Sequence, residues 1–214
     1  MAREREEGMR ITLHNVAKQF AREKVFSKVD HVFGPGSRTA LLGPNGSGKS
    51  TLLQVVAGAL VPTAGTVAHA LADRKVEQEH VYRHVSIAAP YLDLYDDLSL
   101  REALETHARF KPFRAGIEPR AVARTAYLEA HWDKPVTHFS SGMRQRLKLA
   151  MAILCDTPLL LLDEPATNLD AEGIAWFREL LLKHLESRTL LVASNRQEEE
   201  TFACTASVEI SRWK

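Results

Sequence analysis

Short stretches in which apolar and polar residues alternate occupy the beginning of the chain. Residues 11–13 and 25–33 follow a period of two, and Gly34-Pro35-Gly36 then gives a turn signal. Alternation of this kind is typical of strands with one face in the core and the other in water. The pattern predicts a small, partly antiparallel sheet in this part of the chain.

Continuous apolar runs indicate a second kind of strand. Residues 39–42, 159–162 and 189–193 show no alternation, as in parallel strands that are buried on both faces. One helix is predicted over residues 51–60. Another is indicated by four apolar residues at helical spacing: Ile174, Phe177, Leu181 and Leu185. Strands that alternate with helices predict a layered α/β fold with ligands at the carboxyl ends of the strands.

The pattern is weaker between residues 61 and 90. Short strands are expected over residues 66–70 and 81–88. The residues between them, 73–80, are mostly polar and predict a solvated loop.

A helical segment separates the first two continuous apolar runs. Ser99 and Glu102 have the spacing of a capping box and predict a helix that extends to Phe110. A second helix is predicted over residues 119–130. We therefore expect residues 91–135 to form a small helical lobe inserted between two strands of the main sheet.

The segment after the first continuous run carries the strongest chemical signal. The phosphate-binding pattern G-x-x-x-x-G-K-[ST] is matched without exception by Gly43-Pro44-Asn45-Gly46-Ser47-Gly48-Lys49-Ser50-Thr51. Glycines let the main chain curl around a triphosphate, and the free amides of a helix start favour an anion. Lys49 is expected at the β- and γ-phosphates, and the Ser50 hydroxyl at Mg²⁺. The chain is predicted to bind a nucleoside triphosphate.

Two carboxylates end the run of four leucines. Asp163 suits a Mg²⁺ role, and Glu164 would act on the attacking water as a general base. Strand ends also carry Asp or Glu for structural reasons alone. The phosphate-binding pattern in the same chain favours the catalytic interpretation.

Composition excludes several other classes. The 28 basic and 27 acidic residues nearly cancel, so no surface for a polyanion is indicated. Cys155 and Cys204 lack metal-like spacing and are expected to be reduced thiols. Residues 1–8 precede no apolar signal region, and no run approaches the roughly 20 apolar residues of a membrane span.

A second anion-binding helix start is predicted later in the chain. It is formed by Phe139-Ser140-Ser141-Gly142-Met143-Arg144-Gln145-Arg146, in which the serines can cap the following helix. With this segment the chain, over residues 9–210, resembles the ATP-binding cassette (ABC) family, the nucleotide-hydrolysing subunits of ABC transporters. The motifs occur in the family's order: Walker A at residues 43–51, the signature at 140–146, Walker B at 159–165 and the D-loop at 168–170.

The resemblance implies a set of functional residues. ATP would be contacted by Phe20, Gly43, Pro44, Asn45, Gly46, Ser47, Gly48, Lys49, Ser50, Thr51, Ser140, Ser141, Gly142 and Asp170. Ser50 and Asp163 would bind Mg²⁺, and Glu164 and Asn195 would take part in catalysis. Phe20 would stack on adenine, although an ordinary core aromatic is an equal alternative.

The resemblance also implies the fold: an α/β P-loop NTPase core of the ABC type with a mixed sheet, a small antiparallel β subdomain and an inserted helical lobe. A single domain is expected over residues 9–210, with its core in 9–90 and 136–210 and its lobe in 91–135. Residues 1–8 would form a polar N-terminal extension.

In this family two cassettes close on ATP. The single set of motifs implies that a second copy or a homologue supplies the other set, and a homodimer formed on ATP binding is expected. One interpretation has the subunit energise a separate membrane permease, docked near residues 91–97, from the cytoplasmic face of the membrane. The other is a soluble ABC-type ATPase in cofactor assembly or another mechanical role. No nucleic-acid partner is indicated, and no guanine-reading Asn-Lys-x-Asp run occurs.

Three departures from the family pattern stand out. The signature reads Phe-Ser-Ser-Gly-Met over residues 139–143, Ala89-Pro90-Tyr91 stands where a glutamine is expected, and Asn195 replaces a histidine. Asparagine donates a hydrogen bond but cannot carry a proton. ATP binding of ordinary strength with slow hydrolysis is therefore predicted.

Overall fold

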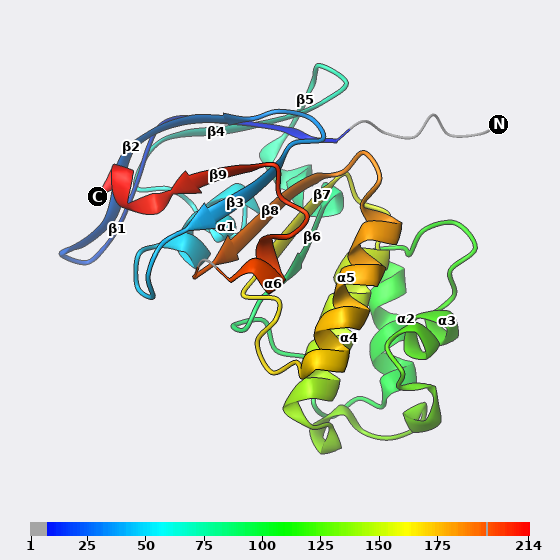
Figure 1. Ribbon diagram of the computed structural model, residues 1–214. Coiled ribbons are helices and arrows are strands. Elements are labelled where there is room, and N and C mark those ends of the chain that lie inside the picture. The colour runs from blue at the N-terminus through cyan, green and yellow to red at the C-terminus, as the bar shows by residue number, and fades with distance from the viewer. Residues whose placement is uncertain (1–7, 196) are drawn as a thin grey trace. The chain divides into compact units, whose positions relative to one another are not determined.

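A computed structural model describes residues 8–195 and 197–214 (Figure 1). The chain divides into two compact units. The strand unit comprises residues 8–87, 157–164 and 186–214, and the helical unit comprises residues 88–156 and 165–185. The chain therefore passes between the two units four times.

An antiparallel sheet forms one part of the strand unit, with strand order β2-β1-β4-β5 (Figure 1). Its members are β1 (Arg10–Phe20), β2 (Glu23–Phe33), β4 (Ala64–Leu71) and β5 (Arg74–Val76). Ile11 pairs with Phe33 across β1 and β2, and both side chains are buried. The small antiparallel sheet predicted from the alternating pattern is confirmed.

A second sheet has five strands in the order β6-β7-β8-β3-β9. Its members are β6 (Val85–Ala88), β7 (Leu159–Asp163), β8 (Thr189–Ser194), β3 (Arg38–Leu42) and β9 (Ala206–Glu209). The pairs β7–β8, β8–β3 and β3–β9 are parallel. Every residue of β7 and β8 is buried, as their unbroken apolar runs predicted.

Three strands of this sheet end at the same edge. Leu42 pairs with Ser194, and Asp163 pairs with Ala193. The residues that follow β3, β7 and β8 therefore leave the sheet side by side. The phosphate-binding loop, Glu164 and Asn195 all start from this edge.

Helix α1 (Lys49–Val56) starts earlier and ends earlier than the predicted 51–60 helix. Gly58, with φ +72°, lies in the left-handed region just beyond its end, where glycine terminates helices readily. Both sheets and α1 share one apolar core. Its fully buried members include Phe26, Phe33, Leu41, Leu52, Leu53 and Leu161.

The prediction of a loop over residues 73–80 is wrong in secondary structure, although these residues are mostly exposed, as expected. Leu71 pairs with Arg74, so Ala72 and Asp73 form a two-residue hairpin turn with φ +44° and +62°. This turn lacks the usual Asn-Gly or Gly signal, so β5 was not predicted. Residues 81–84, predicted as strand, belong to the 3₁₀ helix η1 (Gln78–His84).

The remaining parts of the strand unit lie at the two ends of the chain. Helix α6 (Glu198–Thr201) follows β8, and η4 (Ile210–Trp213) follows β9. Of the predicted 1–8 extension, residues 1–7 lie outside the described residues. Gly8 is buried and packs closely against the chain: a Cβ there would lie 2.3 Å from the Gly36 amide nitrogen.

The helical unit is larger than the predicted 91–135 lobe, because two further long helices pack with it. Its elements are α2 (Leu100–Phe110), α3 (Pro119–Thr125), η2 (Glu129–His131), η3 (Val136–His138), α4 (Ser141–Leu154) and α5 (Ala171–Leu185). Helix α3 stops well before residue 130, because Tyr127 adopts φ +60° just after its last turn. Figure 1 shows α4 and α5 side by side.

The predicted capping box at the start of α2 is confirmed. The Ser99 hydroxyl accepts from the Glu102 amide, and the Glu102 carboxylate accepts from the Ser99 amide. Neither Cys155 nor Cys204 forms a disulfide within the described part of the chain. Within residues 8–195 and 197–214, no helix has the length and apolar character needed to cross a membrane.

Candidate functional site

The loop between β3 and α1 has a backbone that requires glycine. Gly48, with φ +103°, caps α1, and a Cβ there would lie 2.6 Å from Val25 Cγ1. Gly43 is equally restricted, since its Cβ would lie 2.7 Å from the Ser47 hydroxyl. The first amides of α1 therefore remain available at this loop, as an anion requires.

Lys49 lies at the centre of this loop. Its side chain is 4% exposed, and Nζ donates to the carbonyl oxygens of Gly43 at 2.8 Å and Pro44 at 3.2 Å. A third hydrogen bond, of 2.6 Å, goes to Oδ1 of Asn195. The positive charge is thus held over the loop by three oxygens that an incoming phosphate can replace.

Asn195 reaches the same loop from the end of β8. Its Nδ2 donates to Oδ1 of Asn45 at 2.5 Å, while its Oδ1 accepts from Lys49. The structure thus brings the predicted catalytic Asn195 together with the phosphate-binding loop. The role of Asn45 as its partner was not predicted, because the two residues are 150 positions apart in the sequence.

Asp163 is 1% exposed, and neither of its carboxylate oxygens has a hydrogen-bond partner among the described residues. Burial raises the pKa of this carboxyl and the Glu164 carboxylate adds to the rise, whereas the Ser50 hydroxyl and Lys49 oppose it. Ser50 lies near enough to favour the carboxylate without a hydrogen bond of ordinary geometry. Two unpaired carboxylate oxygens beside a hydroxyl are ligands that suit Mg²⁺.

Glu164 follows Asp163 in an unusual backbone conformation. Its φ is +47°, and its amide donates to the Ala193 carbonyl at 3.0 Å. The left-handed region is costly for a residue with a Cβ, and such residues occur in turns and at functional sites. The turn ends β7 at Asp163 and directs the chain, with the half-buried Glu164 side chain, away from the strand.

Phe20 lies at the end of β1, and it is 49% exposed. The Lys18 ammonium group lies 4.8 Å from its ring centroid. A residue this exposed is not part of the core, so the core-aromatic interpretation is wrong. Stacking of Phe20 on a purine stays a prediction.

The predicted signature residues belong to the helical unit. Ser140 caps α4, and its hydroxyl accepts from the Met143 amide at 3.2 Å. Ser140, Gly142 and Asp170 line a cavity of about 290 Å³ in this unit. The side chain of Ser141 is exposed, and it is not among the residues that line this cavity.

The cavity also has walls that the sequence did not indicate. Its other lining residues are Tyr127, Leu128, His131, Met143, Arg146, Asn168 and Leu169. Tyr127 and His131 precede the signature motif by several positions, and no local pattern connects them with it. Of these residues, Met143, Arg146 and the loop residues 168–169 belong to motifs that the sequence singled out.

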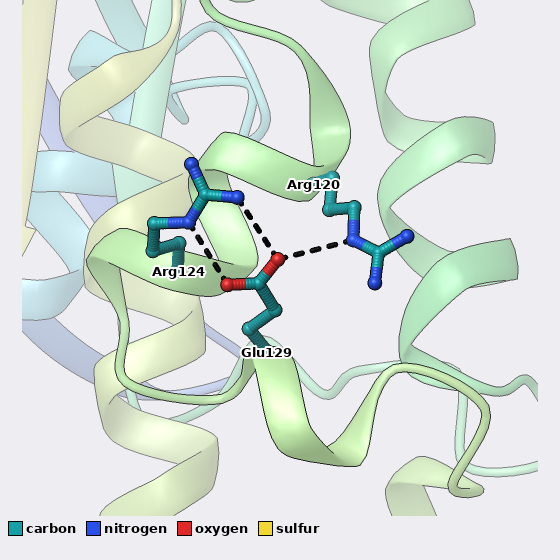
Figure 2. Close-up of polar contacts among 3 residues, drawn as sticks. All are labelled: Arg120, Arg124 and Glu129. Carbon is teal, nitrogen blue, oxygen red and sulfur yellow. Dashed lines mark hydrogen bonds and ion pairs between the residues drawn. The ribbon is translucent and has the colours of Figure 1, made fainter.

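Ion pairs connect α3 with η2 on either side of the turn that carries Tyr127 and Leu128. Glu129 accepts from Arg124 at 2.9 and 3.0 Å and from Arg120 at 3.1 Å (Figure 2). Hydrogen bonds from the two guanidinium groups lower the pKa of this carboxyl to about 2. Figure 2 shows the carboxylate between the two arginines, with Arg124 bound in the bidentate manner.

Comparisons with known proteins agree with these motifs. A family model described as "ABC transporter" matches residues 26–167. The chain is 30% identical over 190 residues to the "Cytochrome c biogenesis ATP-binding export protein CcmA" of Brucella abortus, covering 87% of this chain and 85% of that protein. It is 31% identical over 204 residues to the "Nod factor export ATP-binding protein I" of Burkholderia lata, of whose length it spans 65%.

Solved structures show the same fold. A structure titled "Structure of ATP binding subunit of ABC transporter" has a TM-score of 0.78 at 24% identity, covering 93% of this chain and 85% of that one. A "Putative ABC transporter (ATP-binding protein)" from Pyrococcus furiosus has a TM-score of 0.77 at 17% identity, covering 96% and 99%.

Proposed function

This chain belongs to the ABC transporter family, and from that premise we propose that it binds and hydrolyses ATP to drive a transporter. The proposal rests on the buried carboxylate of Asp163, the last residue of β7. Its two oxygens have no hydrogen-bond partner among the described residues, and the phosphate-binding loop lies beside it. Removing a charged carboxylate from water is unfavourable unless a ligand compensates for the loss. A Mg²⁺–triphosphate complex held there would supply that compensation.

The strand unit supplies the groups that hold the nucleotide. Lys49 exchanges its protein oxygens for those of the β- and γ-phosphates, and the amides at the start of α1 donate to the same groups. Ser50 and Asp163 would hold Mg²⁺, which when bound neutralises charge on the phosphates. Phe20 provides an exposed ring for the base.

Glu164 and Asn195 carry the chemical step. Glu164 accepts a proton from water as the water oxygen bonds to the γ-phosphorus, and the bond from that phosphorus to the leaving oxygen of ADP breaks. Asn195 donates to the γ-phosphate from the position where it now contacts Lys49. Because asparagine does not titrate, it supplies hydrogen bonding without proton transfer.

Closure on ATP requires a second subunit. Ser140 and Gly142, at the start of α4, offer groups to an anion in the helical unit, whereas Lys49 and Asp163 belong to the strand unit. The single set of motifs supports a homodimer in which the signature face of one copy meets the phosphate held by the other. Hydrolysis then removes the bridging phosphate and the pair opens.

Of the two interpretations that the sequence left open, the transporter is favoured. Two of the relatives reported above carry export in their names. Tyr91 and Tyr95 are 40% and 72% exposed in the segment where a permease is expected to dock, and Asp93 lies between them. We place the subunit at the cytoplasmic face of a membrane, bound to a separate permease.

ATP-driven pairing is the test of this function. The Glu164→Gln variant keeps the nucleotide site but lacks the base, so ATP and Mg²⁺ should convert it into a dimer that elutes earlier in gel filtration. The matched control is Lys49→Ala in the same background, which should lose ATP binding and stay monomeric. A Glu164→Gln protein that binds ATP yet remains a monomer at every protein concentration contradicts the proposal.

A further inference from the structure

We propose that Arg146 is a positioning residue that fixes the start of α4 to the loop 165–170. The inference rests on the proposed function, because it concerns the face that closes over the nucleotide of a second copy. Arg146 itself touches no reacting atom. It acts by holding Ser140, Gly142 and Asp170 in one arrangement.

Aromatic rings hold the Arg146 guanidinium group in place. Its Cζ lies 5.4 Å from the ring centroid of Tyr127 and 5.9 Å from that of Trp176. Trp176 is itself fixed, since its Nε1 donates to the Thr125 carbonyl at 2.7 Å. Two ring faces attract the cation and limit its freedom, so the side chain, 19% exposed, has a defined direction.

That direction leads to Asp170. The Arg146 and Asp170 charged groups are 3.6 Å apart, and Asp170 Oδ1 also accepts from the Gly173 amide at 2.8 Å. Arg146 therefore reaches the side chain that caps the start of α5. Because Asp170 is 75% exposed, the ion pair adds little stability and its effect is geometric.

Two neighbouring contacts connect the same helix face to the same loop. Gln145 Nε2 is buried and donates to the Pro165 carbonyl at 2.8 Å. At Gly142 a Cβ would lie 3.2 Å from the Asn168 carbonyl oxygen, so helix and loop approach closely. Positions 142, 145 and 146 have the spacing of one helix face.

These contacts bring the helix start and the loop to a single cavity of about 290 Å³, which Ser140, Gly142, Arg146 and Asp170 all line. A face assembled in advance does not have to be ordered when the second copy closes, so closure costs less free energy. Loss of Arg146 should therefore affect closure and turnover, and leave the binding of ATP to the separate subunit intact.

The experiment compares Arg146→Met with Lys148→Met. Lys148 lies on the same helix outside the signature residues 140–146 and donates to the Ala89 carbonyl at 3.5 Å, so it controls for loss of a charge from α4. Arg146→Met should lower kcat by roughly ten- to a hundredfold and leave the ATP Kd within about twofold and the Tm unchanged. Arg146→Lys, which keeps the charge but lacks the planar group, should recover part of kcat.

Asp170→Asn provides a second variant, because an asparagine still caps α5 through its side-chain oxygen. This variant should also lower kcat without a change in Tm, and the double variant should be no worse than the poorer single one. Equal kcat for Arg146→Met and Lys148→Met overturns the inference. Additive losses in the double variant overturn it as well.

Failure of the proposed function would give a different experimental result. If the Glu164→Gln protein binds ATP but does not dimerise, no site is formed between two copies. That result contradicts both the proposed function and this inference. If that protein dimerises and Arg146→Met in the same background dimerises at the same ATP concentration, the function stands and only the role of Arg146 is refuted.

Discussion

Glu164 is both the proposed general base and a residue with an unfavourable backbone conformation. A left-handed φ of +47° costs about 1–3 kcal/mol for a residue with a Cβ. The sequence predicted the carboxylate from its place after four leucines, but not this conformation. Backbone strain has no sequence signature at a non-glycine residue, and here the surrounding strands impose it.

Asn195 makes the slow turnover predicted from the sequence testable. Asn195→His introduces a group that donates to the γ-phosphate and also carries a proton, so kcat should rise by up to about 10²-fold. The variant should also acquire a pH dependence near the ordinary histidine pKa of about 6.5, which the parent lacks at this position. Steady-state ATPase rates between pH 5.5 and 8.5 measure both effects.

The control for this prediction is Asn195→Ala. It removes the contacts to Lys49 and Asn45 together, and should lower kcat further. If the alanine and histidine variants both turn over ATP at the parental rate, then Asn195 has no part in the chemical step.

At the scale of elements, helix α2 was predicted with its correct bounds because its start signal is local. Ser99 and Glu102 satisfy each other within one turn, and no distant residue is needed. The β5 strand was missed for the opposite reason. Its hairpin turn uses Ala72 and Asp73, and only pairing with β4 forces both into the left-handed region.

Loss of the α2 cap should therefore have a modest, specific effect. Ser99→Ala leaves the Glu102 amide without its partner and should lower stability by about 1 kcal/mol, or about 2–4 °C in Tm. Thermal unfolding followed by circular dichroism measures the change. Ser99→Thr, which keeps the hydroxyl that caps the helix and donates to Glu102, should retain most of the Tm, and equal Tm values for the alanine and threonine variants contradict the capping role.

The stability of the whole molecule should depend on pH through His107. This side chain stacks on Phe113 with its Nε2 3.0 Å from Cys155 Sγ, and burial, aided by Lys111, lowers its pKa to about 4. The unfolded chain binds the proton more readily, so stability is fully present above pH 6.5 and is lost as the pH falls toward 4. At 1.36 kcal/mol for each pH unit, the difference amounts to about 3 kcal/mol.

Urea unfolding at a series of pH values tests this dependence. His107→Gln removes the titrating ring and should flatten the curve between pH 6.5 and 4, at the expense of some stability at pH 8. The buried His69, whose pKa burial also lowers, keeps part of the slope. An unchanged slope in the glutamine variant would show that His107 does not titrate in this range.

For the molecule as a whole, the sequence predicted contiguous features and missed contacts between distant ones. The phosphate-binding loop and β7 were predicted because each has a pattern of consecutive residues. The contacts of Asn45 with Asn195, and of Arg146 with Asp170, join positions that no local pattern connects. The helical unit extends beyond residues 91–135 because α4 and α5 pack with α2 and α3 through such distant contacts.

The interleaved path of the chain has a consequence for its synthesis. Strand β3 leaves the ribosome early, yet both of its sheet neighbours, β8 and β9, come from residues 189–209. At 5–20 residues per second, translation of the intervening residues 43–188 takes on the order of ten seconds. During that interval the backbone N–H and C=O groups of β3 lack the strands that they pair with in the folded protein. We expect chaperones to bind a nascent chain that exposes such an apolar strand.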